Sequence, residues 1–246
     1  MSALIVGDVH GRHTSIFRMI DQATSRGLTN VIQVGDYGST FTRTFIRKVE
    51  EYARKAGVTL RFADGNHEDH AFLRSLPKTR DGAHLVSGHV LYQPRGSVAE
   101  IDGARVMFFG GAVSVNKTYL KSRGKLWQEQ EAITDIDVAV ARRSDPVDVL
   151  ISHDAPSSVT LPEDLFHLEA SNVIKAEAHR NRELLQEVVE AVTPKAVYHG
   201  HYHRRMNNLT TLPSGLTIPT YGLAADAQAG SYMVEQFKMT QEKSAA

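Results

Sequence analysis

Cysteine is absent from the 246-residue sequence. Disulfide bonds, thiolate metal sites and a cysteine nucleophile are therefore excluded, and any metal ion has to be held by nitrogen and oxygen ligands. Long hydrophobic runs are absent too: stretches such as residues 106–109 have the length of a strand, far below the about 20 residues that a membrane-spanning helix needs. The N-terminal residues lack the basic and apolar segments of a signal peptide. We expect a cytoplasmic protein with no membrane partner.

Net charge is the third property that the chain lacks. Lysine and arginine together number 28, as do aspartate and glutamate, so the formal net charge is zero. A general electrostatic attraction to nucleic acid is therefore not expected. Aromatic residues make up only 7% of the sequence, which gives no sign of a stacking face for single strands. We expect a small substrate rather than a nucleic acid.

The order of hydrophobic patterns predicts a protein of the α/β or α+β class with one domain. In the first third, strand-like runs at residues 3–6, 30–34 and 58–62 alternate with amphipathic stretches at 13–26 and 42–56, so we expect parallel strands with helices on the sheet faces. The remaining predicted elements are strands at 84–92, 97–101 and 105–109, a helix at 128–143, a strand at 147–152, a helix at 170–192, and strands at 195–199, 207–212, 216–221 and 231–237. The first three of these strands are separated by turn residues and are expected to pair antiparallel. This mixture favours two sheets packed face to face, with helices outside.

The first polar cluster is Gly7-Asp8-Val9-His10-Gly11, directly after the first strand. Successive side chains of an extended chain point to opposite faces, so Asp8 and His10 are predicted to leave the backbone on one side. A carboxylate oxygen and an imidazole nitrogen can then approach one metal ion. Such a pair is common at strand ends, and its meaning depends on whether other clusters supply partners.

Four further polar clusters also lie at or just after the end of a strand-like run, the edge at which α/β sheets build ligand sites. They are Gly35-Asp36-Tyr37-Gly38, Gly65-Asn66-His67-Glu68-Asp69, Ser152-His153-Asp154 and Gly200-His201-Tyr202-His203. Each also has an ordinary structural interpretation: Asp36 can cap a helix, Asn66 can adopt a left-handed turn, and His153 can be a buried histidine. His201 and His203 can be surface residues. One shared ligand site explains all the clusters together better than independent coincidences do.

In chain order, the clusters match the pattern GDxH, GD, GNH with an acidic residue, a single His, and GHxH. This ordered set resembles the calcineurin-like metallophosphoesterase superfamily, in particular its small bacterial and phage phosphodiesterases, and the resemblance extends from Asp8 to His203. It implies a four-layer α/β/β/α sandwich of two mixed β-sheets flanked by helices, in agreement with the pattern of elements. It also implies a hydrolase with a binuclear metal centre.

The resemblance assigns a role to each matching position. The implied metal ligands are Asp8, His10 and His203 for the first ion, Asn66, His153 and His201 for the second, and Asp36 as a bridge between the two. His67 would not be a ligand, because this position contacts the phosphate in the family and serves as general acid or stabiliser of the transition state. His67 and Asp36 are therefore the predicted catalytic residues. The predicted substrate contacts are Asn66, His67, Arg12 and Tyr37.

Histidine nitrogens together with aspartate and asparagine oxygens suit transition metals better than Mg²⁺ or Ca²⁺. We expect two divalent ions, with manganese favoured and iron, zinc or nickel as alternatives. Two dications that face only the carboxylates of Asp8 and Asp36 keep a net positive charge even with a bridging hydroxide, and this charge attracts an anionic phosphoester. The implied reaction is hydrolysis by direct attack of that hydroxide.

A second resemblance lies in residues 110–117, Gly-Gly-Ala-Val-Ser-Val-Asn-Lys, followed by Arg123 and by Trp-Gln-Glu at 127–129. These residues are similar to a GGA-x-S-x-DK…R…W…E pattern in some bacterial and phage members, although Asn116 stands where an Asp is usual. We predict that residues 112–146 are an insertion that forms a wall of the substrate cleft. A surface helical hairpin with its tryptophan packed in the core is the alternative.

The predicted boundaries are a metallophosphoesterase domain at residues 1–237 and a flexible polar tail at 238–246. The sequence contains no heptad repeat or apolar strip that predicts an oligomeric state.

The favoured function is hydrolysis of phosphodiesters, with 2′,3′- or 3′,5′-cyclic nucleotides as the expected substrates. Protein phosphatases of the superfamily carry GDxxDRG and RGNHE. Here Asp36 is followed by Tyr37-Gly38, and Asp64 precedes Gly65, which counts against a phosphoprotein substrate.

Three alternatives remain open at this stage. One is a phosphomonoesterase or protein phosphatase. Another is a nuclease on the same metal core that contacts a short strand through Arg204-Arg205 and the basic residues at 117–125. The last is a non-catalytic scaffold, as the retromer subunit of this fold is, although the intact ligand positions count against it.

Overall fold

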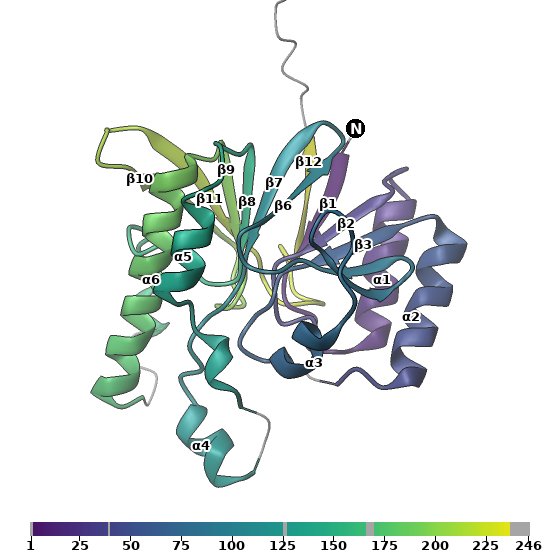
Figure 1. Cartoon of the computed structure of the whole chain (residues 1–246), viewed down its shortest axis with the longest axis horizontal. Helices are drawn as coiled ribbons and strands as arrows, with labels where there is room; N and C mark the ends of the chain where they lie inside the picture. Colours follow the sequence, from purple (N-terminus) through teal and green to yellow (C-terminus); the bar gives the residue numbers. More distant parts are fainter. Residues whose placement is uncertain (1, 39, 125–126, 166–169, 237–246) are drawn as a thin grey trace, which may run out of the picture.

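The computed structural model of the chain describes residues 2–38, 40–124, 127–165 and 170–236. Helices and strands alternate in the first part of the chain, and strands predominate in the last part (Figure 1). The helices are α1 (His13–Thr24), α2 (Arg43–Ala56), α3 (His70–Ser75), α4 (Lys117–Ser122), α5 (Asp135–Ala141) and α6 (Asn172–Val192), with the short 3₁₀ helices η1 (Glu129–Glu131) and η2 (Glu163–Leu165). The strands are β1 (Ser2–Val6), β2 (Asn30–Gln33), β3 (Thr59–Phe62), β4 (His84–Ser87), β5 (Val90–Tyr92), β6 (Ser97–Ile101), β7 (Ala104–Phe109), β8 (Val149–Ser152), β9 (Ala196–His199), β10 (Met206–Thr211), β11 (Thr217–Gly222) and β12 (Tyr232–Gln236).

These strands form two six-stranded sheets. The first sheet has the order β12-β1-β2-β3-β5-β4 and the second β10-β11-β9-β8-β7-β6. Both are mixed: β1, β2 and β3 pair in parallel, as do β7, β8 and β9, and antiparallel pairs flank them. In Figure 1 the sheets lie between α1 and α2 on one side and α5 and α6 on the other. The predicted four-layer α/β/β/α sandwich is confirmed.

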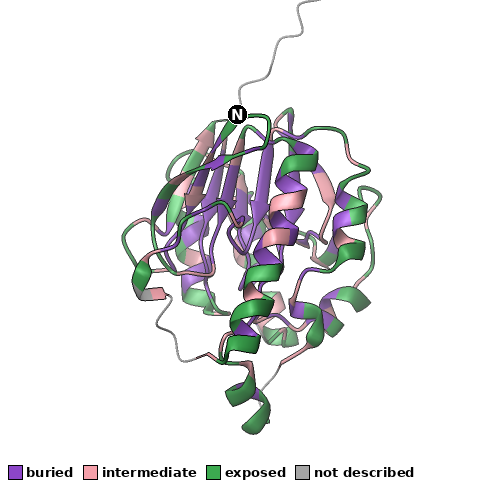
Figure 2. Ribbon diagram, turned by 90° about the vertical axis from the view of Figure 1, so that its left-hand side faces the viewer, coloured by how far each residue is buried: buried purple, intermediate pink, exposed green. Residues whose placement is uncertain are grey.

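Alternation along the strands sorts the core into three layers. In β1, Leu4 packs with α1 and α2, whereas its neighbour Ile5 packs between the two sheets. In β7, Phe108 faces the first sheet and Met107 faces α6. Because both faces of these strands are covered, they read as continuous apolar runs in the sequence. Figure 2 shows the buried strands at the centre and the exposed outer faces of the helices.

The helices of the first sheet begin and end close to their predicted bounds. Thr42 caps α2, because its side-chain oxygen accepts a hydrogen bond from the backbone N–H of Phe45 at 3.1 Å. Gly57 ends the helix in the left-handed conformation, with a φ of 65°. Asp36 therefore has no part in capping this helix, which removes the ordinary interpretation of that residue.

The prediction of one helix at 128–143 is wrong. Two short helices, η1 and α5, replace it, and Thr134 starts the second of them. The Thr134 hydroxyl accepts a hydrogen bond from the N–H of Asp137, and the Asp137 carboxylate accepts one from the N–H of Thr134. This reciprocal capping begins a new helix at Thr134, although the spacing of apolar residues suggested one continuous helix.

The prediction for residues 84–109 is correct in part. β4 and β5 pair antiparallel, as do β6 and β7. However, β5 belongs to the first sheet, where it pairs in parallel with β3, and β6 belongs to the second. The chain therefore crosses between the sheets here. The sequence interpretation missed the short helix α3, and it gave helical structure around α4 only as an alternative. Helix α4 projects from the edge of the sandwich (Figure 1).

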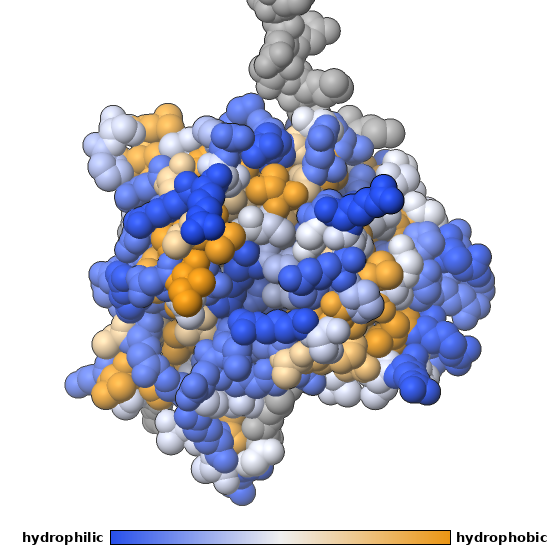
Figure 3. Space-filling model, in the orientation of Figure 1, coloured by the Kyte–Doolittle hydropathy of each residue, from blue (hydrophilic) through white to orange (hydrophobic). Residues whose placement is uncertain are grey.

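On the face shown in Figure 3, hydrophobic side chains lie as separate patches among hydrophilic ones. Among the residues that the structure describes, no helix is both long and apolar enough to cross a membrane. The predicted domain bounds stay a prediction, and the predicted tail at 238–246 lies outside the described residues.

Candidate metal centre

All five polar clusters lie at one edge of the sandwich, beyond the carboxyl ends of β1, β2, β3, β8 and β9. Within the first sheet, the N–H of His10 donates a hydrogen bond to the carbonyl of Asp36 at 2.8 Å. Between the sheets, the N–H of His201 lies 3.3 and 3.2 Å from the two carboxylate oxygens of Asp8. Hydrogen bonds from backbone N–H groups, one to a carbonyl and one to a side-chain carboxylate, thus hold the loops of the two sheets together.

Left-handed backbone is concentrated in these loops. The φ angles are 49° at His10, 56° at Asp36, 66° at His201 and 54° at His203. Such angles are costly for residues other than glycine, and they persist where the surroundings hold them, often at functional sites. They also correct the argument from strand alternation: β1 ends at Val6, and a turn, rather than an extended strand, directs the His10 side chain.

Two glycines allow the loops to close around the carboxylates. A Cβ atom at Gly65 would overlap Oδ1 of Asp36, and one at Gly200 would overlap Oδ1 of Asp8. Only a residue without a side chain permits this approach. The two buried carboxylates are therefore positioned by packing as well as by hydrogen bonds.

The first predicted ligand set forms a compact cluster. One donor atom from each of Asp8, His10, Asp36 and His203 lies within 4.8 Å of all the others. The Nε2 atoms of His10 and His203 are 3.0 Å apart, and Nε2 of His203 is 3.1 Å from Oδ2 of Asp8. The carboxylates are buried and the imidazoles exposed, so the cluster faces solvent on one side.

The second set adjoins Asp36. Nε2 of His153 lies 3.5 Å from Oδ1 of Asp36 and 3.1 Å from Oδ1 of Asn66. Nδ1 of His153 is 3.1 Å from the carbonyl of Val34, which suits an Nδ1–H donor and leaves Nε2 facing the two oxygens. The ring of His201 lies beside that of His153, with 5.1 Å between their centroids. His201 is thus near this set.

The electrostatics of the cluster fit a bound cation. Burial lowers the pKa of His153, but the Asp36 carboxylate outweighs burial and raises that pKa to about 10. Burial raises the pKa of Asp36, yet the contact with His153 keeps it well below its ordinary value. The buried Asp36 carboxylate therefore favours a positive charge at the neighbouring imidazole. A metal ion at the same place supplies that positive charge, so the nitrogen and oxygen donors present fit a divalent transition ion.

His67 lies next to the ligands. Its backbone N–H donates to Oδ1 of Asp36 at 2.9 Å, and the centroid of its ring is 5.6 Å from that of His10. The side chain is half-buried. The ring is therefore at the rim of the cluster, where it can reach a bound anion.

Glu68 is a structural member of the site for which the sequence interpretation gave no role. Its buried carboxylate accepts hydrogen bonds from the backbone N–H groups of Tyr37 and Gly65, the second at 2.6 Å. Burial raises the pKa of Glu68 well above its ordinary value, and the Asp36 charge adds to this effect. Glu68 connects the loop that carries Asp36 to the loop that carries Asn66. Its place in the GNH cluster was the only available signal.

The structure contradicts the predicted substrate contact of Tyr37. The ring is only 1% exposed and stacks on Phe62, with 4.3 Å between centroids. It lies in the core because the left-handed turn at Asp36 directs the next side chain inward. Arg12, by contrast, is exposed just before α1, and its contact with substrate stays a prediction.

A cavity of about 270 Å³ is lined by one candidate ligand of each set, His201 and His203. Val115, Leu161 and Ala178 contribute apolar walls to it. Val115 belongs to the predicted cleft-wall segment 112–146, whose role as a whole stays a prediction.

Buried hydrogen bonds hold the loop that borders this cavity. The Arg182 guanidinium donates to the carbonyls of Ala155 and Pro156, at 3.1 and 2.9 Å. Asp154 accepts hydrogen bonds from the amide of Asn181 at 2.8 Å and from the Tyr202 hydroxyl. Asp154 therefore stabilises the loop, and these contacts do not include a ligand histidine.

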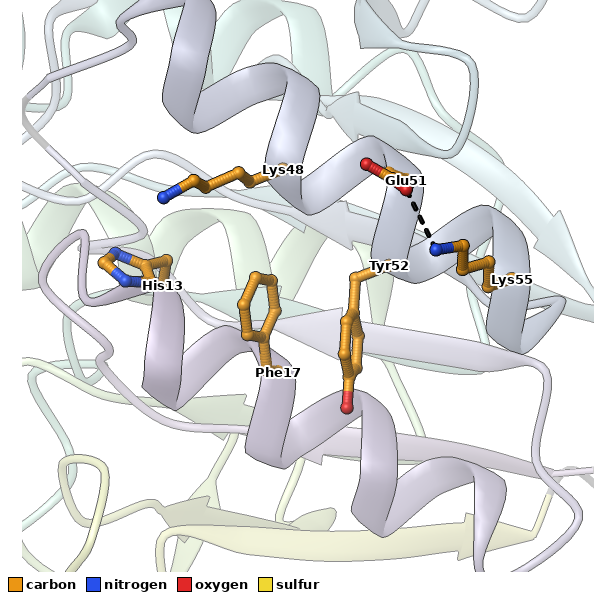
Figure 4. A pocket seen from close by; sticks show the side chains of 6 residues that line it. All are labelled: His13, Phe17, Lys48, Glu51, Tyr52 and Lys55. Atoms are coloured by element: carbon orange, nitrogen blue, oxygen red, sulfur yellow. Dashed lines mark hydrogen bonds and ion pairs between the residues drawn. The ribbon is translucent and has the colours of Figure 1, made fainter.

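Another pocket lies between α1 and α2, and its lining includes none of the candidate ligands (Figure 4). The rings of Phe17 and Tyr52 stack in it with 4.2 Å between centroids. Nζ of Lys55 lies 2.9 Å from the Glu51 carboxylate. The stacking and the ion pair account for this surface as a helix–helix contact.

The sequence matches the model of the calcineurin-like phosphoesterase family over residues 1–205. The chain therefore belongs to this family, whose members use a dinuclear metal centre. No curated protein matches the sequence.

Several solved structures are similar in fold. A dimetal phosphatase from Danio rerio is 13% identical, with a TM-score of 0.49 over 92% of this chain and 87% of that chain. The protein TT1561 from Thermus thermophilus is 9% identical, with a TM-score of 0.49 over 96% of this chain and 98% of its own. Another solved structure is 12% identical, with a TM-score of 0.50 over 96% of this chain and 99% of that chain.

Proposed function

We propose that this family member hydrolyses nucleotide phosphodiesters, in particular 2′,3′- or 3′,5′-cyclic nucleotides, at two divalent transition-metal ions. The observation that carries the proposal is the cluster of Asp8, His10, Asp36 and His203, with donor atoms within 4.8 Å of each other. Bound divalent ions would polarise the phosphoryl oxygens and lower the pKa of water to a value useful at neutral pH. Manganese is the metal we favour.

In this proposal Asp36 and His67 act as a unit. Oδ1 of Asp36 accepts the His67 N–H at 2.9 Å, which fixes the His67 backbone relative to the ligands. The His67 ring is then within reach of a phosphoryl group that lies beside His10. From there His67 hydrogen-bonds a phosphoryl oxygen and donates a proton to the departing ester oxygen.

The cavity beside His201 and His203 supports a substrate that carries a flat aromatic ring with polar edges. In this proposal the phosphate lies at the ligand cluster and the organic part of the substrate lies against Val115, Leu161 and Ala178. Binding pockets for small molecules combine such apolar walls with a few polar groups. A nucleobase has this character. The cavity therefore favours a nucleotide over a phosphopeptide, whose attached chain has to lie on the surface.

A substrate panel with the Mn²⁺-loaded protein tests the proposal. The panel contains 2′,3′- and 3′,5′-cyclic nucleotides, nucleoside monophosphates, a phosphopeptide and single-stranded DNA. We expect the highest kcat/KM for a cyclic nucleotide. Preference for a monoester, the phosphopeptide or DNA would establish one of the alternative activities and contradict the substrate assignment.

Ala178→Trp tests whether the cavity holds the base. Ala178 lines the cavity, whereas Ala176, on the same helix, is exposed and provides the matched Ala176→Trp control. Filling the cavity should raise KM for the cyclic nucleotide about 10-fold or more and leave methyl p-nitrophenyl phosphate, which carries no base, much less affected. Equal KM values for the two variants would place the base elsewhere. The cytoplasmic location, the small-molecule partner and the choice of metal stay predictions.

A further inference from the structure

The segment after β7 reaches the metal centre through Ser114. Nδ2 of Asn66 lies 2.9 Å from Oγ of Ser114, and Oγ of Ser114 lies 2.7 Å from Oε2 of Glu131. The backbone N–H of Ser114 also donates to Oε1 of Glu131, at 2.8 Å. The three residues are 7%, 1% and 2% exposed. Water therefore has little access to this chain of hydrogen bonds.

The carboxylate of Glu131 determines which group donates and which accepts in each of these hydrogen bonds. A carboxylate only accepts hydrogen bonds, so Glu131 takes the hydroxyl proton of Ser114 as well as its N–H. The Ser114 oxygen then has only lone pairs to offer to Asn66. The NH₂ group of the Asn66 amide has to face Ser114, and its oxygen has to face the other way.

This direction matters because an asparagine amide can bind a metal through oxygen only in one of its two orientations. Here Oδ1 of Asn66 points toward Nε2 of His153, at 3.1 Å, and so toward the second ligand set. With the amide reversed, an NH₂ group would face the cation and repel it. The Asn66 orientation is therefore set by a residue 65 positions away in sequence, since Glu131 directs Ser114 and Ser114 directs Asn66.

Glu131 is itself held in place. The buried Arg95 guanidinium donates to the carbonyls of Glu131 and Ala132, and it pairs with Asp64 through Nη2 at 2.6 Å. Asp64 comes just before the Gly65-Asn66 turn. One ion pair thus fixes both ends of the chain of hydrogen bonds.

We propose that Ser114 and Glu131 are positioning residues that hold the Asn66 amide with its oxygen toward the second metal ion and so determine the affinity of that ion. The inference rests on the metal centre proposed above. It also assigns a role to part of the 112–146 segment: Glu131, rather than the Glu129 of the matching sequence pattern, is the partner of Ser114. The segment contributes to metal binding as well as to the cavity wall.

The test compares Glu131→Gln with Glu129→Gln, the same substitution at an exposed position of the same segment. A glutamine at 131 retains the shape of the side chain but can donate a hydrogen bond to Ser114 through its NH₂ group. The Ser114 hydroxyl can then donate to Asn66, and the orientation of the Asn66 amide is no longer fixed. Mn²⁺ is titrated into the metal-free proteins by calorimetry. We expect two binding events for wild type and for Glu129→Gln. In Glu131→Gln the event that Asn66→Ala also weakens should lose 10- to 100-fold in affinity, while the other remains unchanged.

A double-mutant cycle separates positioning from a general structural effect. If Glu131 acts through Asn66, Glu131→Gln should cause no further loss of Mn²⁺ affinity in an Asn66→Ala background. Saturating Mn²⁺ should restore most of the turnover of Glu131→Gln, because the defect lies in metal affinity. Ser114→Ala should weaken the same event by a similar factor.

Three results would overturn the proposal: unchanged affinities in both single variants, an equal loss at both metal positions, or additive losses in the cycle. A wild-type protein that binds no Mn²⁺ is a different outcome, since it contradicts the proposed function itself. Melting temperatures of the metal-free proteins accompany each titration. A loss of Mn²⁺ affinity that occurs only in an unfolded variant counts against the positioning role. The Asn66→Ala variant shows how much Mn²⁺ affinity is lost when only the ligand is removed.

Discussion

The Nε2 atoms of His10 and His203 lie 3.0 Å apart, although 193 positions separate the two residues. When two imidazole nitrogens bind the same metal ion at about 2.1 Å and the N–metal–N angle is about 90°, the two nitrogens are about 3 Å apart. His10 follows β1 of the first sheet, and His203 follows β9 of the second. The proposed first metal position therefore forms only when the two sheets have packed, so we expect metal binding to be coupled to folding.

Asp36→Asn should weaken both metal positions. The Asp36 carboxylate lies 3.7 Å from Nδ1 of His10 and 3.5 Å from Nε2 of His153, so it faces both ligand sets. The amide removes the charge but retains the size. We expect at least a 10- to 100-fold loss of affinity at each position, measured by Mn²⁺ titration. Loss at one position alone would show that Asp36 is not a bridge.

His67→Ala should retain the metal and lose turnover. The His67 ring lies at the rim of the cluster, and in the described structure its backbone, rather than its ring, contacts Asp36. Removal of a general acid costs about 10²- to 10⁴-fold in rate. The check combines kcat with metal content by atomic absorption. An equal loss of metal would make His67 a ligand and remove its proposed role.

Gly200→Ala should displace the Asp8 carboxylate. The added methyl group would overlap Oδ1 of Asp8 and approach Cγ2 of Val34 to 2.9 Å. We expect loss of the first metal position and a destabilisation of about 1–3 kcal/mol, measured by Mn²⁺ titration and urea unfolding. Gly88→Ala is the control, because Gly88 is exposed and its added methyl group meets only the end of the Glu50 side chain, at 3.1 Å. Equal behaviour of the two variants would contradict the packing argument.

His70 should make stability depend on pH in mildly acidic solution. Burial lowers its pKa to about 4 from an ordinary value of 6.5. Between these pH values the unfolded chain binds more protons, so stability falls as pH decreases from 6.5 to 4, by about 3 kcal/mol for this group. His199 is shifted in the same direction and adds to the slope.

The variant His70→Gln removes the titrating group, and His13→Gln is a control at an exposed position. Urea unfolding at several pH values should show a smaller slope for the first variant and a wild-type slope for the second. A wild-type slope for His70→Gln would show that its burial does not control the protonation.

The candidate ligands could be predicted from the sequence because each follows a strand-like run, and parallel strands bring their carboxyl ends to a common edge. The order of the motifs then gave the family and the four-layer fold. The reason given for the convergence of Asp8 and His10 was nevertheless wrong, since His10 is left-handed and lies beyond the strand. The local sequence pattern carries little information on whether a residue other than glycine adopts the left-handed conformation.

Other features depend on contacts between distant segments. Tyr37 was predicted in the cleft because it follows Asp36, but its ring packs on Phe62 of the neighbouring strand. Glu131 was predicted within a helix, and its buried carboxylate binds Ser114 instead. Whether a side chain is buried, and which group it hydrogen-bonds, depends on tertiary packing. The hydrophobic periodicity of a single segment does not reveal that packing.

Metal analysis of the purified protein tests the central claim most directly. After equilibration with Mn²⁺ and removal of free ions, the account predicts about two transition-metal ions per chain and hydrolysis of phosphodiesters, both abolished by a chelator and restored by Mn²⁺. A folded protein that binds no metal after Mn²⁺ addition and hydrolyses no phosphoester would contradict it.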